Sequence, residues 1–199
     1  MDAPGLANTE PAQVLEFWFG TPELADTEAV TSRWFRKDPA FDREIGERFG
    51  ALMERALAGE LQDWAWQPGP ALARILLLDQ FTRNVFRDTP RAFAGDALAL
   101  EAARAMVLQG QDQALPPLRR VFVYLPFEHA EDEAAQAESM RLFTRLAQEV
   151  PALDGYLDYA RRHQEIVQRF GRFPHRNAVL GRPSTDEETA FLKQPGSGF

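Results

Sequence analysis

Three histidines are the side chains of this sequence best suited to exchange a proton near neutral pH. His129 directly follows Glu128, and a histidine beside a carboxylate can work as an oriented general base. His163 and His175 come later in the chain. If the protein is an enzyme, we expect these four residues to be catalytic, in a hydrolase or lyase that uses acid–base chemistry. The alternative is that His163 is a core histidine and that the acidic residues near His129 stabilise a helix start.

A second chemical feature is a segment in which arginines alternate with aromatic residues, Phe170-Gly171-Arg172-Phe173-Pro174-His175-Arg176-Asn177. Aromatic side chains can anchor such a loop while planar guanidinium groups project from it. A guanidinium binds carboxylate or phosphate through two parallel hydrogen bonds. We therefore predict that Arg172, Arg176 and Asn177 contact an anionic ligand. The alternative is that these arginines pair with carboxylates of the same chain, which would fix the loop without any activity.

A third feature is a run of polar residues that follows a strongly apolar segment. On one helix Asp79, Arg83 and Arg87 would stack four residues apart, and Gln80 and Asn84 would form a parallel pair. We predict that these five residues form the rim of a ligand site. An intrahelical ion pair between Asp79 and Arg83, with hydrogen bonds to other helices, is the alternative.

The sequence gives no sign of a metal site or of a cofactor. The absence of cysteine excludes disulfides and thiolate ligands. Neither His-Glu-x-x-His nor Glu-x-x-His occurs. The sequence therefore predicts no metal and no cofactor.

The elements that must position these residues are helices. Apolar residues recur at helical spacing along the chain, and no long stretch alternates apolar and polar residues as a half-buried strand would. Asp38-Pro39 is typical of a helix start, and the apolar run 75–78 indicates a buried central helix. We expect helices over or within 12–19, 39–59, 70–87, 90–110, 118–124, 131–149, 152–170 and from 184.

These patterns predict an all-α fold: a compact antiparallel array of about eight helices. With 199 residues, of which 45% are hydrophobic, the chain can bury a sizeable core, so we expect a single helical domain over 1–199. Residues 1–10 and 194–199 are predicted to be tails.

The charge balance narrows the range of partners. The net charge of −8 argues against nonspecific binding to nucleic acid, which needs a basic field. One segment differs, because residues 161–182 hold six arginines against a single glutamate. No apolar run could span a bilayer and no signal peptide is recognisable, so we expect a cytoplasmic protein without a membrane partner.

Several of these segments together resemble a known family. The motifs Leu76-Leu77-Leu78-Asp79-Gln80-Phe81-x-Arg83-Asn84, Pro126-Phe127-Glu128-His129 and Phe170 to Asn177 are similar to those of the uncharacterised bacterial family called domain of unknown function 924. The segments 14–20 and 195–199 look like its two ends, so the resemblance covers nearly the whole chain. It implies an all-helical, tetratricopeptide-like fold and no activity. Thr82 departs from the family pattern, which usually has Pro at that position, where it would bend or end the helix.

The residues favour a binding module in which arginines and histidines line a pocket for an anionic small molecule or an acidic peptide. A purely structural network of arginines and carboxylates ranks second, and an acid–base enzyme ranks third. These hypotheses differ in whether the polar residues converge, and in whether a cavity lies beside them.

Overall fold

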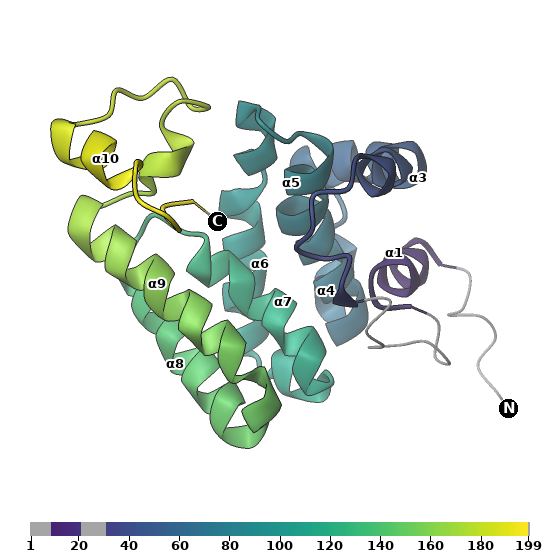
Figure 1. The fold of residues 1–199 in the computed structure, drawn as a ribbon. Coiled ribbons are helices and arrows are strands. Elements are labelled where there is room, and N and C mark those ends of the chain that lie inside the picture. Colours follow the sequence, from purple (N-terminus) through teal and green to yellow (C-terminus); the bar gives the residue numbers. More distant parts are fainter. Residues whose placement is uncertain (1–8, 21–30, 199) are drawn as a thin grey trace, which may run out of the picture. The chain divides into compact units, whose positions relative to one another are not determined.

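The computed structural model describes residues 9–20 and 31–198, and these residues form helices and turns without any β-strand (Figure 1). The predicted all-α fold is confirmed. Most of the expected N-terminal tail, residues 1–8, lies outside the described residues. No helix of the described chain is long and apolar enough to cross a membrane.

Two compact units make up the chain. The first comprises Met1–Arg87 and Arg91–Pro126, and the second comprises Asp88–Pro90 and Phe127–Phe199. Each unit brings together a different set of the polar residues singled out above. The expectation of one domain stays a prediction.

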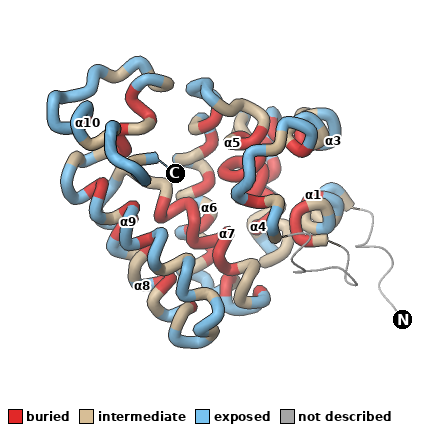
Figure 2. The backbone as a smooth tube through the Cα atoms, viewed as in Figure 1, coloured by how far each residue is buried: buried red, intermediate tan, exposed pale blue. Residues whose placement is uncertain are grey.

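The first unit is built from helices that bury an aromatic core. Its helices are α1 (Glu10–Phe19), α3 (Pro39–Leu57), α4 (Pro68–Ile75), α5 (Thr82–Val85), α6 (Asp96–Leu108) and most of α7 (Pro117–Glu128). Asp38 caps α3 as expected, because its carboxylate accepts the backbone N–H groups of Ala40 and Phe41. Trp18 packs against both Phe81 and Phe122. Figure 2 shows α7 buried along most of its length.

A π-helical turn, Leu76–Phe81, joins α4 to α5, so the chain is helical from Pro68 to Val85. Hydrogen bonds in a π-helix run to the fifth residue, so the return to α-helix leaves a carbonyl oxygen without its usual N–H partner. The hydroxyl of Thr82 donates to the carbonyl oxygen of Leu78 at 2.8 Å. Thr82 thus continues the helix at the position where the family pattern would place Pro.

The second unit begins with the end of α7, which passes through Pro126 and finishes at Glu128. Our expectation that this helix stops before Pro126 was wrong, and the difference puts Glu128 in the last turn of a helix. A pair of long helices follows, α8 (Glu133–Glu149) and α9 (Asp154–Phe170), which lie side by side (Figure 1). A loop then leads to the short helix α10 (Asp186–Phe191). Its capping box is formed by Thr185 and Glu188. The box therefore starts one residue later than Ser184, where the sequence predicts it.

Candidate functional site

The predicted rim residues of the first unit are engaged with carboxylates of that unit. Asp79 is 1% exposed, and its carboxylate lies 3.0 Å from the guanidinium of Arg83. The same guanidinium lies 2.9 Å from Asp96, a residue that the sequence reasoning did not single out. The side chain of Gln80 donates to Asp79. Arg83 is therefore held between two carboxylates.

The other two rim residues contact α3. Asn84 donates to Asp42 at 2.8 Å, and Arg87 binds the same carboxylate through two of its nitrogens, at 2.6 and 3.1 Å. This bidentate pair joins α3 to the end of α5. The arrangement matches the structural alternative described above for Asp79, Arg83 and Arg87.

Ion pairs within the second unit engage the loop arginines. Arg172 binds both carboxylate oxygens of Glu188, at 2.6 and 2.8 Å, and its hydrogen bond holds the pKa of Glu188 at about 2. Arg182 binds both oxygens of Glu131, at 2.5 and 2.8 Å. Although burial raises the pKa of Glu131, the hydrogen bonds from Arg182 and from the backbone of Phe173 lower it below its ordinary value.

Asn177 belongs to the same loop network. It is 1% exposed, donates to the hydroxyl of Ser184 at 3.0 Å and accepts from Arg182 at 3.0 Å. Its side chain therefore joins the two ends of the loop. This position gives Asn177 a structural part, and its predicted contact with a ligand stays a prediction.

The remaining predicted residues come together in the second unit, in what we call the histidine cluster: Glu128, His129, His163, His175 and Arg176. Oε1 of Glu128 lies 3.1 Å from Nδ1 of His163. The rings of His129 and His163 have their centroids 6.1 Å apart. The predicted catalytic residues Glu128 and His163 thus lie within hydrogen-bond reach, as acid–base chemistry requires.

Phe173 packs between the histidines and Arg176. Its ring centroid is 5.4 Å from that of His163 and 5.7 Å from that of His175. The guanidinium carbon of Arg176 lies over the same ring, 4.5 Å from its centroid, in a cation–π contact. Phe173 is fully buried and was read from the sequence only as an anchor for the loop. Phe173 therefore links His163 of α9 to His175 and Arg176 of the loop.

Burial controls the protonation of His163, whose exposed fraction is 4%. Burial, together with the nearby charges of His129, Arg176 and His175, lowers the pKa of His163 to about 3, and the hydrogen bond to the backbone of Tyr159 acts in the opposite direction. Nδ1 lies 2.9 Å from the carbonyl oxygen of Tyr159, one helical turn earlier. A carbonyl oxygen only accepts, so the Nδ1 atom carries the proton and Nε2 keeps its lone pair.

The junction between α7 and α8 positions Glu128 and His129. The side-chain amide of Gln136, on α8, donates to the carbonyl oxygens of Glu128 and Ala130 at 2.6 and 2.8 Å. The carbonyl of Glu128 is the last of α7 and has no partner within the helix, and that of Ala130 belongs to the turn that follows. The carboxylate of Asp132 caps α8 by accepting the N–H of Ala135. Both helix ends at the junction are therefore fixed.

The loop that carries His175 and Arg176 is held on both sides. Gly171 ends α9 with φ 70°, in the left-handed region that favours glycine. Glu131 accepts the backbone N–H of Phe173 at 2.8 Å. A Cβ atom added at Gly198 would lie 3.9 Å from that of His175, so the C-terminal segment passes beside this histidine.

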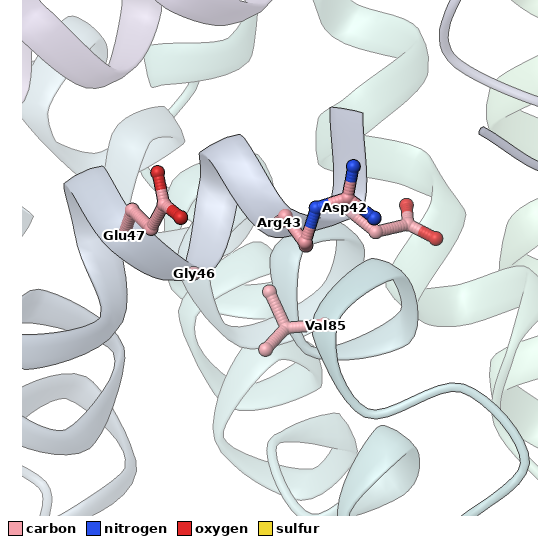
Figure 3. A pocket seen from close by; sticks show the side chains of 5 residues that line it. All are labelled: Asp42, Arg43, Gly46, Glu47 and Val85. Carbon is pink, nitrogen blue, oxygen red and sulfur yellow. The ribbon is translucent and has the colours of Figure 1, made fainter. Parts of the chain in front are cut away.

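Two surface hollows of the described chain are lined by none of the predicted site residues. The first, of about 320 Å³, lies between α3 and α5 and is lined by Asp42, Arg43, Gly46, Glu47 and Val85 (Figure 3). The second, of about 400 Å³, lies at the start of α9 and is lined by Asp154, Gly155, Leu157, Asp158 and Arg161. Both are flanked by acidic side chains, so neither resembles a site for an anion.

Comparison with known proteins places the chain in a family. Residues 14–196 match the model of a bacterial protein family of unknown function, DUF924. The chain belongs to this family. The resemblance recognised in the motifs of the sequence is thereby confirmed, and it extends over nearly the whole chain.

A protein of known structure has a similar fold. The chain is 42% identical to a protein of unknown function from Agrobacterium tumefaciens, with a TM-score of 0.80. The match covers 92% of this chain and 96% of that one. No curated protein matches the chain. The comparisons therefore establish the family and a similar fold, and the activity has to be inferred from the residues.

Proposed function

We propose that this protein is a binding module for a small anionic molecule and that the histidine cluster of the second unit is its site. The observation that carries the proposal is that His163, His175 and Arg176 each contact the ring of Phe173. The ring of His129 lies 6.1 Å from that of His163. His129 and His175 are partly exposed, so a ligand can reach the cluster from solvent. The ligand class is the one expected from the sequence, an anion, but the proposed binding residues are reduced to those of the histidine cluster.

The other arginines support this narrowing. Arg83, Arg87 and Arg172 each lie within 3.0 Å of a carboxylate oxygen of their own unit. An anion would have to displace those carboxylates, which costs charge-assisted hydrogen bonds of about 1.5–3 kcal/mol each. We therefore assign these three arginines to structural ion pairs. We place the ligand at the histidines and at Arg176, because the guanidinium of Arg176 lies 4.5 Å from the centroid of the Phe173 ring, which His163 and His175 also contact.

The chemistry of the cluster favours a compact anion. Arg176 contributes a permanent positive charge, and its guanidinium is fixed over the ring of Phe173. The imidazole N–H groups of His129 and His175 can donate hydrogen bonds to phosphate and carboxylate oxygens, whereas the N–H of His163 faces the carbonyl oxygen of Tyr159. A phosphorylated or carboxylated small molecule matches these donors, and an acidic peptide terminus offers the same carboxylate group.

Binding is tested by isothermal titration of the purified protein with inorganic phosphate, a sugar phosphate, acetate, succinate and a peptide that ends in aspartate. We expect one of these probes to bind, and we expect His175→Gln or Arg176→Gln to weaken it at least about tenfold, or about 1.4 kcal/mol. Arg161→Gln is the matched control, because Arg161 is an exposed arginine of α9 paired with Asp158. The proposal fails if no probe binds, or if all three variants bind alike.

A second candidate function is acid–base catalysis, and the 3.1 Å separation of Glu128 and His163 favours it. Glu128 would orient the imidazole through Nδ1, and Nε2 would accept a proton from a substrate or from water. The guanidinium of Arg176 would stabilise negative charge in the transition state. The reaction class would be hydrolysis or elimination, as expected from the sequence.

This alternative is tested with chromogenic ester and phosphate substrates at neutral pH. Catalysis by the pair predicts turnover that Glu128→Gln lowers by about 100-fold or more, the usual scale of general-base effects. Turnover that survives Glu128→Gln unchanged would arise elsewhere, and the absence of any turnover would leave the binding proposal alone.

We also propose a cytoplasmic location and a tetratricopeptide-like arrangement of helices. The adjacent long helices α8 and α9 support the comparison with helical-hairpin repeats. The lack of cysteine suits a reducing compartment. The net charge of −8 supports a protein that does not bind nucleic acid.

A further inference from the structure

We propose that Glu128, His129 and His163 form a binding site for a divalent transition-metal ion, with Zn²⁺ as the ion that best suits the donors. One ring nitrogen of each histidine and one carboxylate oxygen of Glu128 all lie within 4.8 Å of one another. Two of the three residues are buried. The site joins the end of α7 to the middle of α9.

The donor set is one that transition metals use. Two imidazoles and one carboxylate bind Zn²⁺ in metallohydrolases, where the fourth position stays open for water or substrate. Nitrogen donors distinguish such a site from the all-oxygen sites of Mg²⁺ and Ca²⁺. The chain has no thiolate to offer, so softer ions are less suited.

The surroundings of His163 match those of a metal ligand. Histidines that bind metals almost always donate their second ring N–H to a carboxylate or a backbone carbonyl, which fixes the ring and the tautomer. The Nδ1 atom of His163 lies 2.9 Å from the carbonyl oxygen of Tyr159, so Nε2 is the nitrogen that would bind the ion. Burial at 4% exposure holds the ring in this orientation.

The distances require a small closure. An ion about 2.1 Å from each of its ligands in tetrahedral geometry holds the donor atoms about 3.4 Å apart. One ring nitrogen of each histidine and one oxygen of Glu128 lie within 4.8 Å of one another, so donors at that separation must approach by about 1.4 Å. The carboxylate of Glu128, which lies 3.1 Å from Nδ1 of His163, must also turn toward Nε2. His129 and Glu128 follow one another at the end of α7, and His129 is partly exposed, so its side chain can turn toward the ion.

Charge also favours the ion. Glu128 is 3% exposed, and a buried carboxylate is stabilised by a nearby cation. The inference does not depend on the proposed function, because metal binding is measured without any organic ligand.

The test is titration of untagged, chelator-treated protein with Zn²⁺ and Co²⁺. We expect one Zn²⁺ per chain by calorimetry and by elemental analysis after dialysis, and we expect visible absorption from bound Co²⁺. Glu128→Gln and His129→Gln should each weaken Zn²⁺ binding at least about 100-fold, because each removes a direct ligand. Glu133→Gln is the control, since this exposed glutamate stands five residues after Glu128 and outside the proposed set, and it should bind Zn²⁺ as the wild type does.

Substoichiometric binding by the wild-type protein would overturn the metal site, and so would equal Zn²⁺ affinity in all three variants. Circular dichroism of each variant separates loss of a ligand from loss of the fold. If Zn²⁺ binds and no anionic probe does, the metal site stands and the proposed function fails. If an anionic probe binds and Zn²⁺ does not, the proposed function stands and the metal site fails.

Discussion

The contacts of single side chains show which arginines of residues 161–182 form structural ion pairs. Six arginines stand between residues 161 and 182, and five of them lie within 4.0 Å of a carboxylate of the second unit: Arg161, Arg162, Arg169, Arg172 and Arg182. The sixth, Arg176, stacks on Phe173 in the histidine cluster. The basic segment that stands out in the sequence is therefore largely neutralised within its own unit.

The ion pair between Glu188 and Arg172 should make stability depend on pH. Its hydrogen bond holds the pKa of Glu188 at about 2, below the value of about 4.3 for an unfolded chain. A lowered folded-state pKa stabilises the fold above the unfolded pKa, and this stabilisation is lost as the pH falls toward 2. We expect Glu188→Gln to lower the free energy of unfolding by about 1–3 kcal/mol at neutral pH.

Urea denaturation of the wild type and of Glu188→Gln, repeated from neutral to acidic pH, measures this contribution. The two midpoints should converge as the pH falls below about 4. A difference that stays constant across the acidic range would show that the charge of Glu188 does not stabilise the fold.

A second side chain tests the π-helical turn. Thr82→Val removes the hydroxyl that donates to Leu78 and keeps the shape of the side chain, so we expect a loss of about 1 kcal/mol of unfolding free energy. Thr144→Val on α8 is the control for the change in helix propensity, because Thr144 is only half-buried. Equal effects of the two substitutions on the denaturation midpoint would contradict this role for the hydroxyl.

The N-terminal end of α6 approaches the π-helical turn closely at Gly95. A Cβ atom at Gly95, which precedes α6, would lie 2.2 Å from the carbonyl oxygen of Leu78 and 2.9 Å from its carbonyl carbon. Backbone atoms cannot move aside as a flexible side chain can. We expect Gly95→Ala to lower the unfolding free energy by at least about 2 kcal/mol.

Gly50→Ala on α3 is the matched control. A Cβ atom there meets nothing within 4 Å, so alanine should raise stability by up to about 1 kcal/mol through its higher helix propensity. Thermal denaturation of both variants gives the comparison. A Gly95→Ala variant as stable as Gly50→Ala would mean that α6 can shift away from Leu78 without cost.

The helices were predictable because their signals are local. Asp38 and the following Pro39 mark the start of α3, and Gly171 marks the end of α9. The end of α7 was mispredicted, since the rule that proline ends a helix did not hold at Pro126. The π-helical turn had no recognisable signal.

The sequence predicted which residue types form the candidate site, but only partly which of them meet in space. His129 and Glu128 are neighbours in the chain, but their approach to His163 depends on the packing of α9 near the end of α7. The partners of the arginines are also distant in sequence: Arg87 binds a residue 45 positions earlier, Asp42. Pairs of this kind follow from tertiary structure, which periodicity does not encode.

The net charge of the whole molecule predicts that the protein does not bind nucleic acid. The net charge is −8, and five of the six arginines at residues 161–182 are paired with carboxylates, so this segment offers little basic charge to a nucleic acid. We expect a short fluorescent DNA duplex to show no change in anisotropy on addition of the protein at low salt. Salt-dependent binding in this assay would mean that the paired arginines are available to other partners.

The most direct test of the histidine cluster is a long-range ¹H–¹⁵N NMR spectrum of the imidazole side chains. The chain has only three histidines, and all three belong to the cluster, so each ring signal reports on this site. We predict a neutral, Nδ1-protonated ring for His163, and we predict that the anionic probe that binds shifts the signals of His129 and His175. A spectrum in which none of the anionic probes moves any of the three rings would contradict the proposal that this cluster is the ligand site.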